Sequence, residues 1–381
     1  MAAATIDADV VIVGAGIAGA SAAYALAPHA RVFVLEREGR PGYHSTGRSA
    51  ALFSATYGNA PVRALARAGR AFLESPPAGF AANPILAPRG SLVYGASARR
   101  DELASRCDDW RRTGTEVRLL SGTEARALVP PLRERVAEVG ILEPGARDID
   151  VDALHQGFLR GARASGVKFM TNAELRAAEF GGGRWRLDTA AGEIGAALLV
   201  NAAGAWADEV ARLAGVAPLG IQPLRRTAVI FECGRFGGPQ GWPMAVNADE
   251  TLYFKADAGR FLASPADQTP SPPCDAQPEE LDVATLIDRL ERETLFEVKR
   301  LTAKWAGLRS FAPDRTPVCG FDPEEPAFFW LAGQGGYGIK TSPALSALAA
   351  ALILRRELPA VLADEGVDPQ SISPARLRGV G

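Results

Sequence analysis

Two kinds of hydrophobic pattern alternate over the first part of the chain. Residues 9–13 and 31–35 are short apolar runs rich in Val, which are typical of parallel strands buried on both faces. Residues 20–27, between the two runs, predict a helix that Pro28 ends. A strand, a glycine turn, a helix and a second strand within about 30 residues predict a right-handed βαβ unit.

The strand and glycine turn return twice later in the chain. Apolar runs at 197–201 and 328–332 predict buried strands, each followed by a Gly-rich turn and a helix. We therefore expect two interleaved domains, one formed by 1–83, 144–216 and 305–381 and the other by 84–143 and 217–304. Further helices are predicted at 61–74, 99–112, 151–165, 206–213 and 281–298 and from residue 343, with a strand meander at 180–194 and antiparallel strands at 223–264.

Composition narrows the class of protein. The 381 residues suggest roughly two domains, and 47% hydrophobic with 23% charged residues is ordinary for a globular protein. A formal net charge of −2 argues against a nucleic-acid partner, which would require a basic face. The 4 cysteines are scattered without a CxxC pair and there are only 3 histidines, so neither a disulfide framework nor a metal site is indicated.

Membrane and targeting signals are weak. No run reaches the roughly 18 apolar residues of a membrane span, and the longest apolar stretch, 344–354, is too short. The N-terminus lacks the basic region of a signal peptide. We expect a cytoplasmic protein without a transmembrane segment. Peripheral attachment to the inner membrane stays open, although no basic amphipathic helix supports it.

Gly14, Gly16 and Gly19 form a GxGxxG motif between the first strand and the first helix. In that motif the first glycine permits a tight turn, the second lets the backbone approach a pyrophosphate, and the third lets helix and strand pack closely. The helix N-terminus offers N–H groups to phosphates. Glu36 ends the second strand, where a carboxylate binds ribose hydroxyls and disfavours NADP. A dinucleotide site is the strong interpretation, and a turn that binds nothing is the alternative.

The later glycine turns favour FAD over NAD. A nicotinamide dehydrogenase usually keeps this unit in one continuous domain, whereas this chain returns to the scaffold at 198–206 and 330–338. The helix after the second turn could direct its N-terminus at the pyrimidine carbonyl of a flavin and stabilise the charge of the reduced form. Each turn alone could equally be an ordinary βα turn.

Residues 41–51, with the sequence PGYHSTGRSAA, resemble the D-amino-acid oxidase superfamily and especially the bacterial FAD-dependent D-arginine dehydrogenases. Matching stretches lie at 152–157, 200–206, 305–311 and 334–339, so the resemblance runs nearly end to end. It implies an α/β fold in which a two-dinucleotide-binding, Rossmann-like FAD domain is interleaved with an α+β substrate domain built on an antiparallel sheet.

The resemblance implies oxidation of a D-amino acid to an imino acid, which water hydrolyses to a 2-oxo acid and ammonia. The α-hydrogen would leave as hydride to the flavin, and the protein would supply orientation and charge. Arg226 and Arg309 match the superfamily's carboxylate clamp, for which Arg suits by its bidentate geometry. Tyr253 and Tyr57 match its active-site tyrosines, with Tyr57 on a loop beside the substrate.

The glycine motifs and the resemblance together give a set of expected site residues. The cofactor-binding residues would be Gly14, Gly16, Ile17, Ala18, Gly19, Glu36, Arg37, His44, Ser45, Thr46, Arg48, Ser49, Ala50, Ala51, Ala203, Gly204, Trp206, Gly307, Gly333, Gly335, Gly336, Tyr337, Gly338, Ile339 and Lys340. The substrate contacts would be Leu52, Ser54, Tyr57, Ser91, Arg226, Tyr253, Arg309 and Gly335. We expect non-covalent FAD, because the superfamily's covalent members carry a Cys that is missing from 307–311.

Three departures from the D-arginine dehydrogenases change the expected substrate. Ser91 replaces a Glu that would hold a cationic side chain, and losing that partner costs about 1.5–3 kcal/mol, or roughly ten- to hundredfold in preference. Leu52 replaces a His of the entrance loop. Lys340 replaces a Gln near the flavin, where a cation would raise the flavin potential unless it lies at the surface. Neutral or hydrophobic D-amino acids are therefore favoured over D-arginine and D-lysine.

Several alternatives stay open. The same fold could pass electrons to O₂ as an oxidase or to a quinone or another carrier as a dehydrogenase. Its arginines would also serve glycine, sarcosine, proline or a 2-hydroxy acid. A flavin-binding subunit without activity is a further alternative. The presence of both clamp arginines and both active-site tyrosines argues against it.

Overall fold

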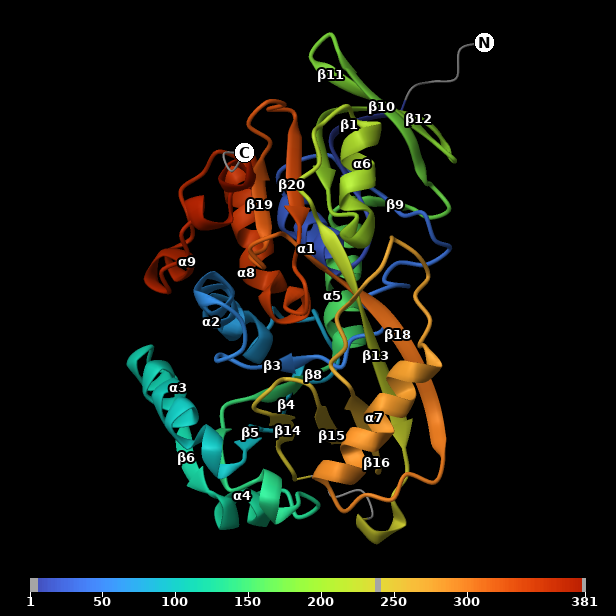
Figure 1. Cartoon of the computed structure of the whole chain (residues 1–381). Helices are drawn as coiled ribbons and strands as arrows, with labels where there is room; N and C mark the ends of the chain where they lie inside the picture. The colour runs from blue at the N-terminus through green and yellow to red at the C-terminus, as the bar shows by residue number, and fades with distance from the viewer. Residues whose placement is uncertain (1–5, 237–240, 379–381) are drawn as a thin grey trace.

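The computed structural model describes residues 6–236 and 241–378, and within these ranges the chain forms an eight-stranded, a nine-stranded and a three-stranded sheet. The two large sheets lie at opposite ends of the molecule (Figure 1). Helices pack on the eight-stranded sheet, and the nine-stranded sheet is mostly antiparallel. The predicted α/β class, a Rossmann-like domain interleaved with an α+β domain, is confirmed.

The predicted βαβ unit forms the middle of the eight-stranded sheet. β1 (Ile6–Val13) pairs in parallel with β2 (Val32–Leu35), and α1 (Ile17–Leu26) connects them. On its other side β1 pairs in parallel with β12 (Gly192–Asn201), which pairs in parallel with β20 (Phe328–Ala332). Strands from three distant parts of the chain thus end at one edge, where their glycine turns meet.

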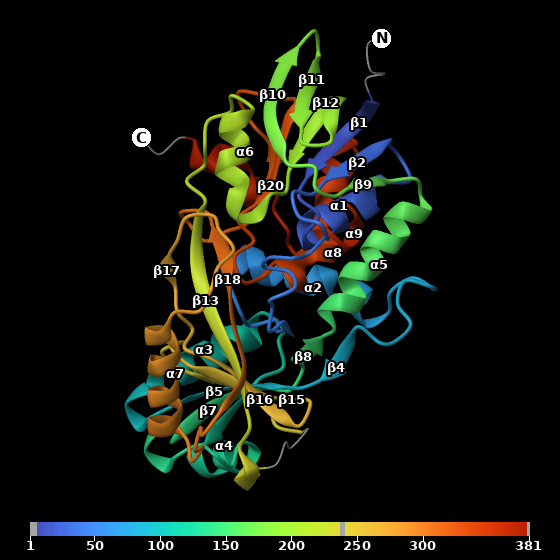
Figure 2. The ribbon, with the colours of Figure 1, turned by 90° about the vertical axis from the view of Figure 1, so that its right-hand side faces the viewer.

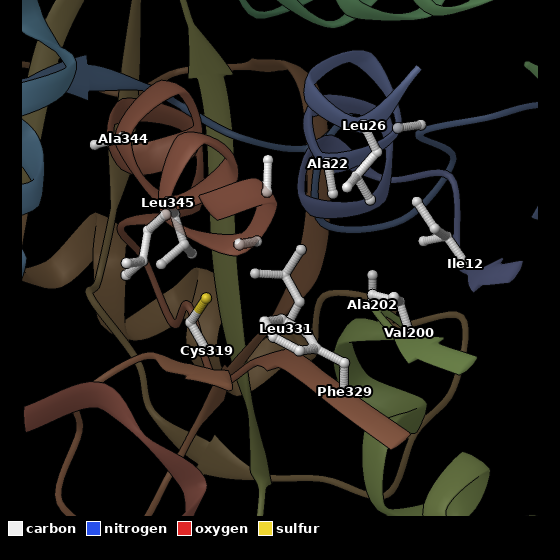
Figure 3. Packing of buried hydrophobic residues seen from close by; sticks show 14 of the residues in the cluster. Ile12, Ala22, Leu26, Val200, Ala202, Cys319, Phe329, Leu331, Ala344 and Leu345 are labelled. Atoms are coloured by element: carbon white, nitrogen blue, oxygen red, sulfur yellow. The ribbon is translucent and has the colours of Figure 1, made fainter. Parts of the chain in front are cut away.

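Alternate residues of these strands enter two different cores, because successive side chains of a strand point to opposite faces. Ile12, Val200 and Leu331 pack in one cluster with α1 and α8 (Gly338–Ile353), as Figure 3 shows. Val11 and Trp330 pack on the other face with α6 (Ala207–Leu213). Burial on both faces explains why these strands are continuous apolar runs.

The rest of the eight-stranded sheet is peripheral to the glycine turns. β10 (Leu175–Gly181) and β11 (Arg184–Thr189) extend β12 as the predicted antiparallel meander. β9 (Lys168–Met170) adds to β2 in parallel, and β19 (Val318–Phe321) adds to β20 in antiparallel orientation.

Two long strands dominate the nine-stranded sheet. β13 (Gln222–Phe231) and β18 (Leu301–Phe311) pair along their whole lengths. They extend from the rest of the nine-stranded sheet toward the eight-stranded sheet (Figure 1). The other strands are β5 (Ser91–Gly95), β6 (Arg118–Ser121), β7 (Val139–Glu143), β14 (Met244–Asn247), β15 (Tyr253–Asp257), β16 (Arg260–Ser264) and β17 (Thr269–Pro270).

A small sheet lies between the two large ones (Figure 2). In it β8 (Arg147–Ile149) pairs with β3 (Leu52–Phe53) and with β4 (Leu86–Pro88). These strands come from segments assigned by sequence to different domains, and β18 crosses the expected boundary at residue 305. The exact division into domains therefore stays a prediction.

The remaining helices cover the sheets. They are α2 (Ala60–Glu74), α3 (Arg100–Arg112), α4 (Gly122–Leu128), α5 (Val151–Ala164), α7 (Glu280–Glu293) and α9 (Ala360–Asp364), with 3₁₀ turns at Ser97–Arg99, Glu134–Val136, Gly204–Trp206, Gly234–Phe236, Gln370–Ile372 and Pro374–Leu377. Across the described ranges, no helix is both long enough and apolar enough to span a bilayer.

Two helix boundaries differ most from the sequence expectation, and α1 also begins earlier than predicted, at Ile17. α8 starts at Gly338, so Pro343 lies inside it, and the hydroxyl of Ser342 donates to the carbonyl of Ile339 that the proline leaves without an amide partner (3.0 Å). α7 ends at Glu293 rather than near residue 298. The backbone of Thr294 is extended, and its hydroxyl donates to the carbonyl of Leu290 (2.6 Å). Thr294 also forms an antiparallel β-bridge with Leu132.

Candidate functional site

A cavity of about 920 Å³ lies where the carboxyl ends of β1, β2 and β12 meet the nine-stranded sheet. The ends of parallel strands where strand order changes are the usual position of nucleotide sites. The loop 42–58, the upper half of β18 and the start of α8 complete the walls. The cavity thus joins both large sheets in one site.

Nearly all residues expected to bind cofactor line this cavity. They are Gly14, Gly16, Ile17, Ala18, Glu36, Arg37, His44, Ser45, Thr46, Arg48, Ser49, Ala50, Ala51, Ala203, Gly204, Trp206, Gly307, Gly335, Gly336, Tyr337, Gly338 and Ile339. The cavity lining does not include Gly19, Gly333 or Lys340. All expected substrate contacts, from Leu52 to Gly335, do line it.

The glycine turn leaves no space for side chains. Gly14 has a φ of +102°, and a Cβ there would lie 2.5 Å from the carbonyl oxygen of Ala202. A Cβ at Gly19 would lie 1.9 Å from the carbonyl oxygen of Gly14, so Gly19 serves helix packing rather than the cavity surface. Gly333, with a φ of +70°, turns the chain behind the cavity against Ala312. These two glycines shape the site without lining it.

Glu36 is held in place at the end of the cavity where the sequence predicts the adenosine of the cofactor. Its carboxylate accepts hydrogen bonds from the amides of Ala15 (3.0 Å) and Glu38 (2.9 Å). Burial raises the pKa of Glu36, and the two amides act against that rise. Each carboxylate oxygen still has acceptor capacity for a ribose hydroxyl. Thr46 accepts from the amide of Ile17 (3.0 Å) and so joins the loop 42–58 to the start of α1.

Aromatic and cationic side chains line the same end. The guanidinium of Arg37 lies 4.8 Å from the centroid of the Trp206 ring, and His44 packs on that ring at 4.7 Å. Arg48 donates to the carbonyls of Ala276 (2.9 Å) and Ala306 (3.0 Å). Its guanidinium also pairs with Asp275, to which the hydroxyl of Tyr43 donates. These contacts hold the loop around residue 275 next to the wall of the cavity that is expected to bind the cofactor.

The opposite wall fits a flavin. Gln334 lines the cavity, and its buried Nε2 has no hydrogen-bond partner within the described part of the chain. Buried donors of that kind are normally satisfied, which points to an acceptor on a bound group. The first turn of α8 directs its amides toward the same space, where they favour negative charge. The wall therefore suits the electron-rich edge of a reduced flavin.

Two arginines and two tyrosines converge at the substrate end. Nη2 of Arg309 donates to the hydroxyl of Tyr57 (2.7 Å). Nε of Arg226 donates to the carbonyl of Asp267 (2.8 Å), and its Cζ lies 6.0 Å from the centroid of the Tyr253 ring. All four side chains line the cavity. The sequence had suggested these residues by resemblance, and the fold brings them together from distant segments.

The two guanidinium groups are poorly balanced by negative charge. Burial and then the charge of Arg309 lower the pKa of Arg226. Burial is the largest influence on the pKa of Arg309 and acts to lower it, but Tyr57, Tyr253 and Tyr337 together outweigh burial and the pKa is raised. Within the described ranges, the carboxylate that forms an ion pair with one of these two guanidinium groups is that of Asp267, whose Oδ1 lies 4.0 Å from Nε of Arg226. A site with two half-buried cations attracts an anionic ligand.

Glycine makes room for this arrangement. A Cβ at Gly336 would lie 1.7 Å from Nη2 of Arg309, and a Cβ at Gly335 would lie 2.2 Å from the ring of Phe311. The turn before α8 can therefore lie directly against the clamp. Cofactor wall and substrate wall are in contact at these two glycines.

Lys340 is a buried residue of α8 that contacts the loop carrying Tyr57. Its side chain leaves α8 away from the cavity, and its ammonium group donates to the carbonyls of Ser54 (2.7 Å) and Tyr57 (2.6 Å). Only 2% of the residue is exposed. The ammonium group is bound by loop 54–58 and does not line the cavity, so the direct role beside the flavin stays a prediction. A surface position, the alternative, is wrong.

Sequence reasoning missed part of the lining. Val93 on β5 and Met244 and Val246 on β14 face the cavity next to Ser91. β5 and β14 pair in parallel with Ser91 opposite Met244, a register that no local motif reveals. The mouth adds five residues that were also missed: Arg63, Arg106, Asp109, Trp110 and Glu250. Alternation along β5 is the one signal that could have identified Val93.

Comparisons with known proteins agree with this site. The family described as FAD dependent oxidoreductase (DAO) matches residues 9–352. The chain is 25% identical over 361 residues to glycine oxidase from Geobacillus kaustophilus, covering 92% of this chain and 93% of that protein. It is 30% identical over 252 residues to sarcosine oxidase subunit beta from Rhizobium meliloti, 60% of each.

The fold comparison gives the same result. The crystal structure of the Geobacillus kaustophilus glycine oxidase superposes with a TM-score of 0.83 at 24% identity, covering 99% of this chain and 100% of that one. The resemblance to the D-amino-acid oxidase superfamily is thereby confirmed. The chain belongs to the FAD dependent oxidoreductase family, and it is an oxidoreductase whose cofactor is FAD.

Proposed function

We propose that the protein oxidises the carbon–nitrogen bond of a small D-amino acid with a neutral or apolar side chain. The observation that carries the proposal is the convergence of Arg226 and Arg309 with Tyr57 and Tyr253 at one end of the FAD cavity. Two half-buried guanidinium groups suit a carboxylate, which arginine binds in bidentate geometry. The D configuration rests on the sequence resemblance.

The clamp orients the substrate through its carboxylate. Arg309 uses one donor on Tyr57 and Arg226 uses one on Asp267, and a guanidinium has five donors. Enough donors remain for bidentate contact with two carboxylate oxygens. A carboxylate fixed there leaves the α-carbon to face the wall formed by Gly335 and the start of α8. Orientation of this kind contributes to rate by removing rotational freedom.

FAD, when bound, supplies the hydride acceptor of the reaction. The side chains of this protein then have to manage one proton, because only a neutral amine has the lone pair that forms the imine. The oxygen of Tyr57 accepts from Arg309, so its own proton is free for a partner in the cavity. We expect the amine proton to pass to water, with the Tyr57 hydroxyl as a hydrogen-bond partner, and the rate therefore to rise with pH.

The lining next to the clamp supports neutral substrates. Leu52, Ser91, Val93, Met244 and Val246 form an apolar surface with one hydroxyl. No acid occupies these five positions, so a cationic side chain would lose its hydration there without a charged partner. Glycine and sarcosine, named in two relatives, are the second candidates, and they would leave this surface uncovered.

Anaerobic bleaching of the purified yellow protein tests the proposal. The panel would contain D- and L-amino acids, glycine, sarcosine and 2-hydroxy acids. We expect D-amino acids with neutral side chains to bleach the flavin ahead of D-arginine. Bleaching by glycine or sarcosine alone would favour the second candidate, and no bleaching at all would contradict both.

The electron acceptor needs a separate measurement. Readmission of air to the bleached protein distinguishes an oxidase, which recovers its colour quickly, from a dehydrogenase that passes electrons to a quinone or another carrier. Release of free FAD on denaturation tests the expectation of non-covalent attachment. Within the described residues the 4 cysteines do not line the cavity, which supports that expectation.

A further inference from the structure

The loop that carries Tyr57 is held from behind by a buried lysine. We call residues 54–58 the Tyr57 loop. Lys340, on α8, donates to carbonyl oxygens at both ends of this loop, Ser54 at 2.7 Å and Tyr57 at 2.6 Å. The lysine is 2% exposed and does not line the cavity. A buried ammonium group needs such acceptors to offset its lost hydration.

A buried glutamate of the nine-stranded sheet holds the same loop from another side. Glu143 ends β7 and is 3% exposed. Its carboxylate accepts from the amide of Ala55 (2.7 Å) and from the hydroxyls of Ser54 (2.6 Å) and Thr56 (2.7 Å). The loop thus offers its amide and hydroxyls to an anion on β7 and its carbonyls to a cation on α8. Each charge fixes a different side of the loop.

The charged and titratable neighbours of Lys340 come from α2, β7, the Tyr57 loop and the turn before α8. Arg63 of α2 opposes its charge, Glu143 of β7 favours it, and the rings of Tyr57 and Tyr337 lie 5.3 Å and 5.8 Å from its Nζ. Burial lowers the pKa of Lys340 to about 7. Protonation of this side chain therefore changes within the pH range in which enzymes usually work.

We propose that Lys340 is a positioning residue, whose ammonium group fixes the Tyr57 loop to α8 and so holds the hydroxyl of Tyr57 on Arg309. The proposal rests on the proposed function, because it assumes that this arginine binds a carboxylate. Lys340 does not line the cavity, and in this proposal it acts through Tyr57. Loss of its proton weakens both hydrogen bonds, since charged donors bind more strongly than neutral ones.

A carboxylate probe tests the proposal without turnover. Benzoate is titrated into the FAD-loaded protein, and the flavin spectrum reports its Kd. We expect Lys340→Met to raise that Kd about tenfold. Lys340→Gln should recover part of the affinity, because an amide can donate to one or both carbonyls. Ser346→Ala removes another buried side chain of α8 that bonds only within the helix, and it serves as the matched control.

Two further readouts separate positioning from a general structural role. In the Tyr57→Phe background, Lys340→Met should cause no additional loss, because the two residues act on the same contact. In the unchanged protein, the Kd of benzoate should rise as the pH passes upward through about 7, and this step should be missing in Lys340→Gln. The pH titration needs no variant, so it tests the proposal even if Lys340→Met does not fold.

The outcomes are distinct. Equal benzoate affinity in the unchanged protein and in Lys340→Met, or a pH-independent Kd, would overturn the role of Lys340 and leave the proposed function intact. Additive losses in the Tyr57→Phe background would show that the lysine acts by another route and also overturn it. Failure of benzoate to perturb the flavin of the unchanged protein would overturn the carboxylate clamp itself, and the inference with it.

Discussion

The FAD end and the substrate end of the cavity are built in different ways. At the FAD end, glycine turns at Gly14 and before α8 present backbone to the ligand, and each turn is a short contiguous motif. At the substrate end, Arg226 and Arg309 come from paired long strands and Tyr57 from a separate loop. The cofactor site can thus be identified from local sequence, whereas the substrate site exists only after the chain has folded.

The two ends of the cavity also differ in which residues can change when a new substrate preference evolves. Gly14 and Gly19 tolerate no side chain, because an added Cβ would collide with main-chain atoms. The cavity lining at Leu52, Ser91 and Met244 instead consists of side chains that face the cavity. We therefore expect substitutions at the FAD end to abolish the enzyme and those at the lining to redirect it.

The largest expected effect is at Gly14. Replacement by Ala would put a Cβ 2.5 Å from the carbonyl oxygen of Ala202 at a φ of +102°, so the turn must open. The purified Gly14→Ala protein should be colourless, which absorbance measures. Gly215→Ala is the matched control, with a φ of +67° but open surroundings, and it should keep its flavin. A yellow Gly14→Ala protein would contradict the role of this turn.

Removal of a clamp arginine should leave FAD bound and lower activity. Arg226→Met loses a charged carboxylate partner, which costs about 3 kcal/mol or roughly a hundredfold in kcat/KM. The control is Arg225→Met, because Arg225 pairs with Glu279 and Asp282 on α7, away from the cavity. Steady-state kinetics on the best substrate would check both variants. Equal losses for the two neighbours would indicate a stability effect instead of a lost contact.

A charge added at Ser91 should change the substrate preference. Ser91 lies in the lining opposite Met244, and Ser91→Glu would supply the acid that the D-arginine dehydrogenases carry. We expect the kcat/KM ratio of D-arginine to D-methionine to rise about ten- to hundredfold. Ser91→Gln has the same size without the charge and should change the ratio little. If the unchanged enzyme already prefers D-arginine, Glu250 at the mouth becomes the acid to remove.

The difference between short contiguous motifs and contacts of distant segments also determines what could be predicted from the sequence. The βαβ unit and its glycines were identified because each element is encoded by neighbouring residues within one short segment. The direction of Lys340 was not, because it depends on the approach of the loop at Ser54 to α8. Nor could the pairing of Met244 with Ser91 be foreseen, since parallel register between distant strands has no local signal. The clamp was named through family resemblance, and its geometry came only with the fold.

The smallest expected effect concerns the loop that crosses the FAD end. Asp275 pairs with Arg48 and accepts from Tyr43, but it is exposed to solvent, so screening limits the stabilisation to about 1 kcal/mol or less. Asp275→Asn should therefore weaken FAD binding by no more than about fivefold. Fluorescence titration of the apoprotein with FAD at low and high salt would measure this, and the difference between variant and parent should shrink at high salt. A salt-independent loss would mean that the backbone contacts of Arg48 with Ala276 and Ala306, rather than its ion pair, hold this end of the cavity closed.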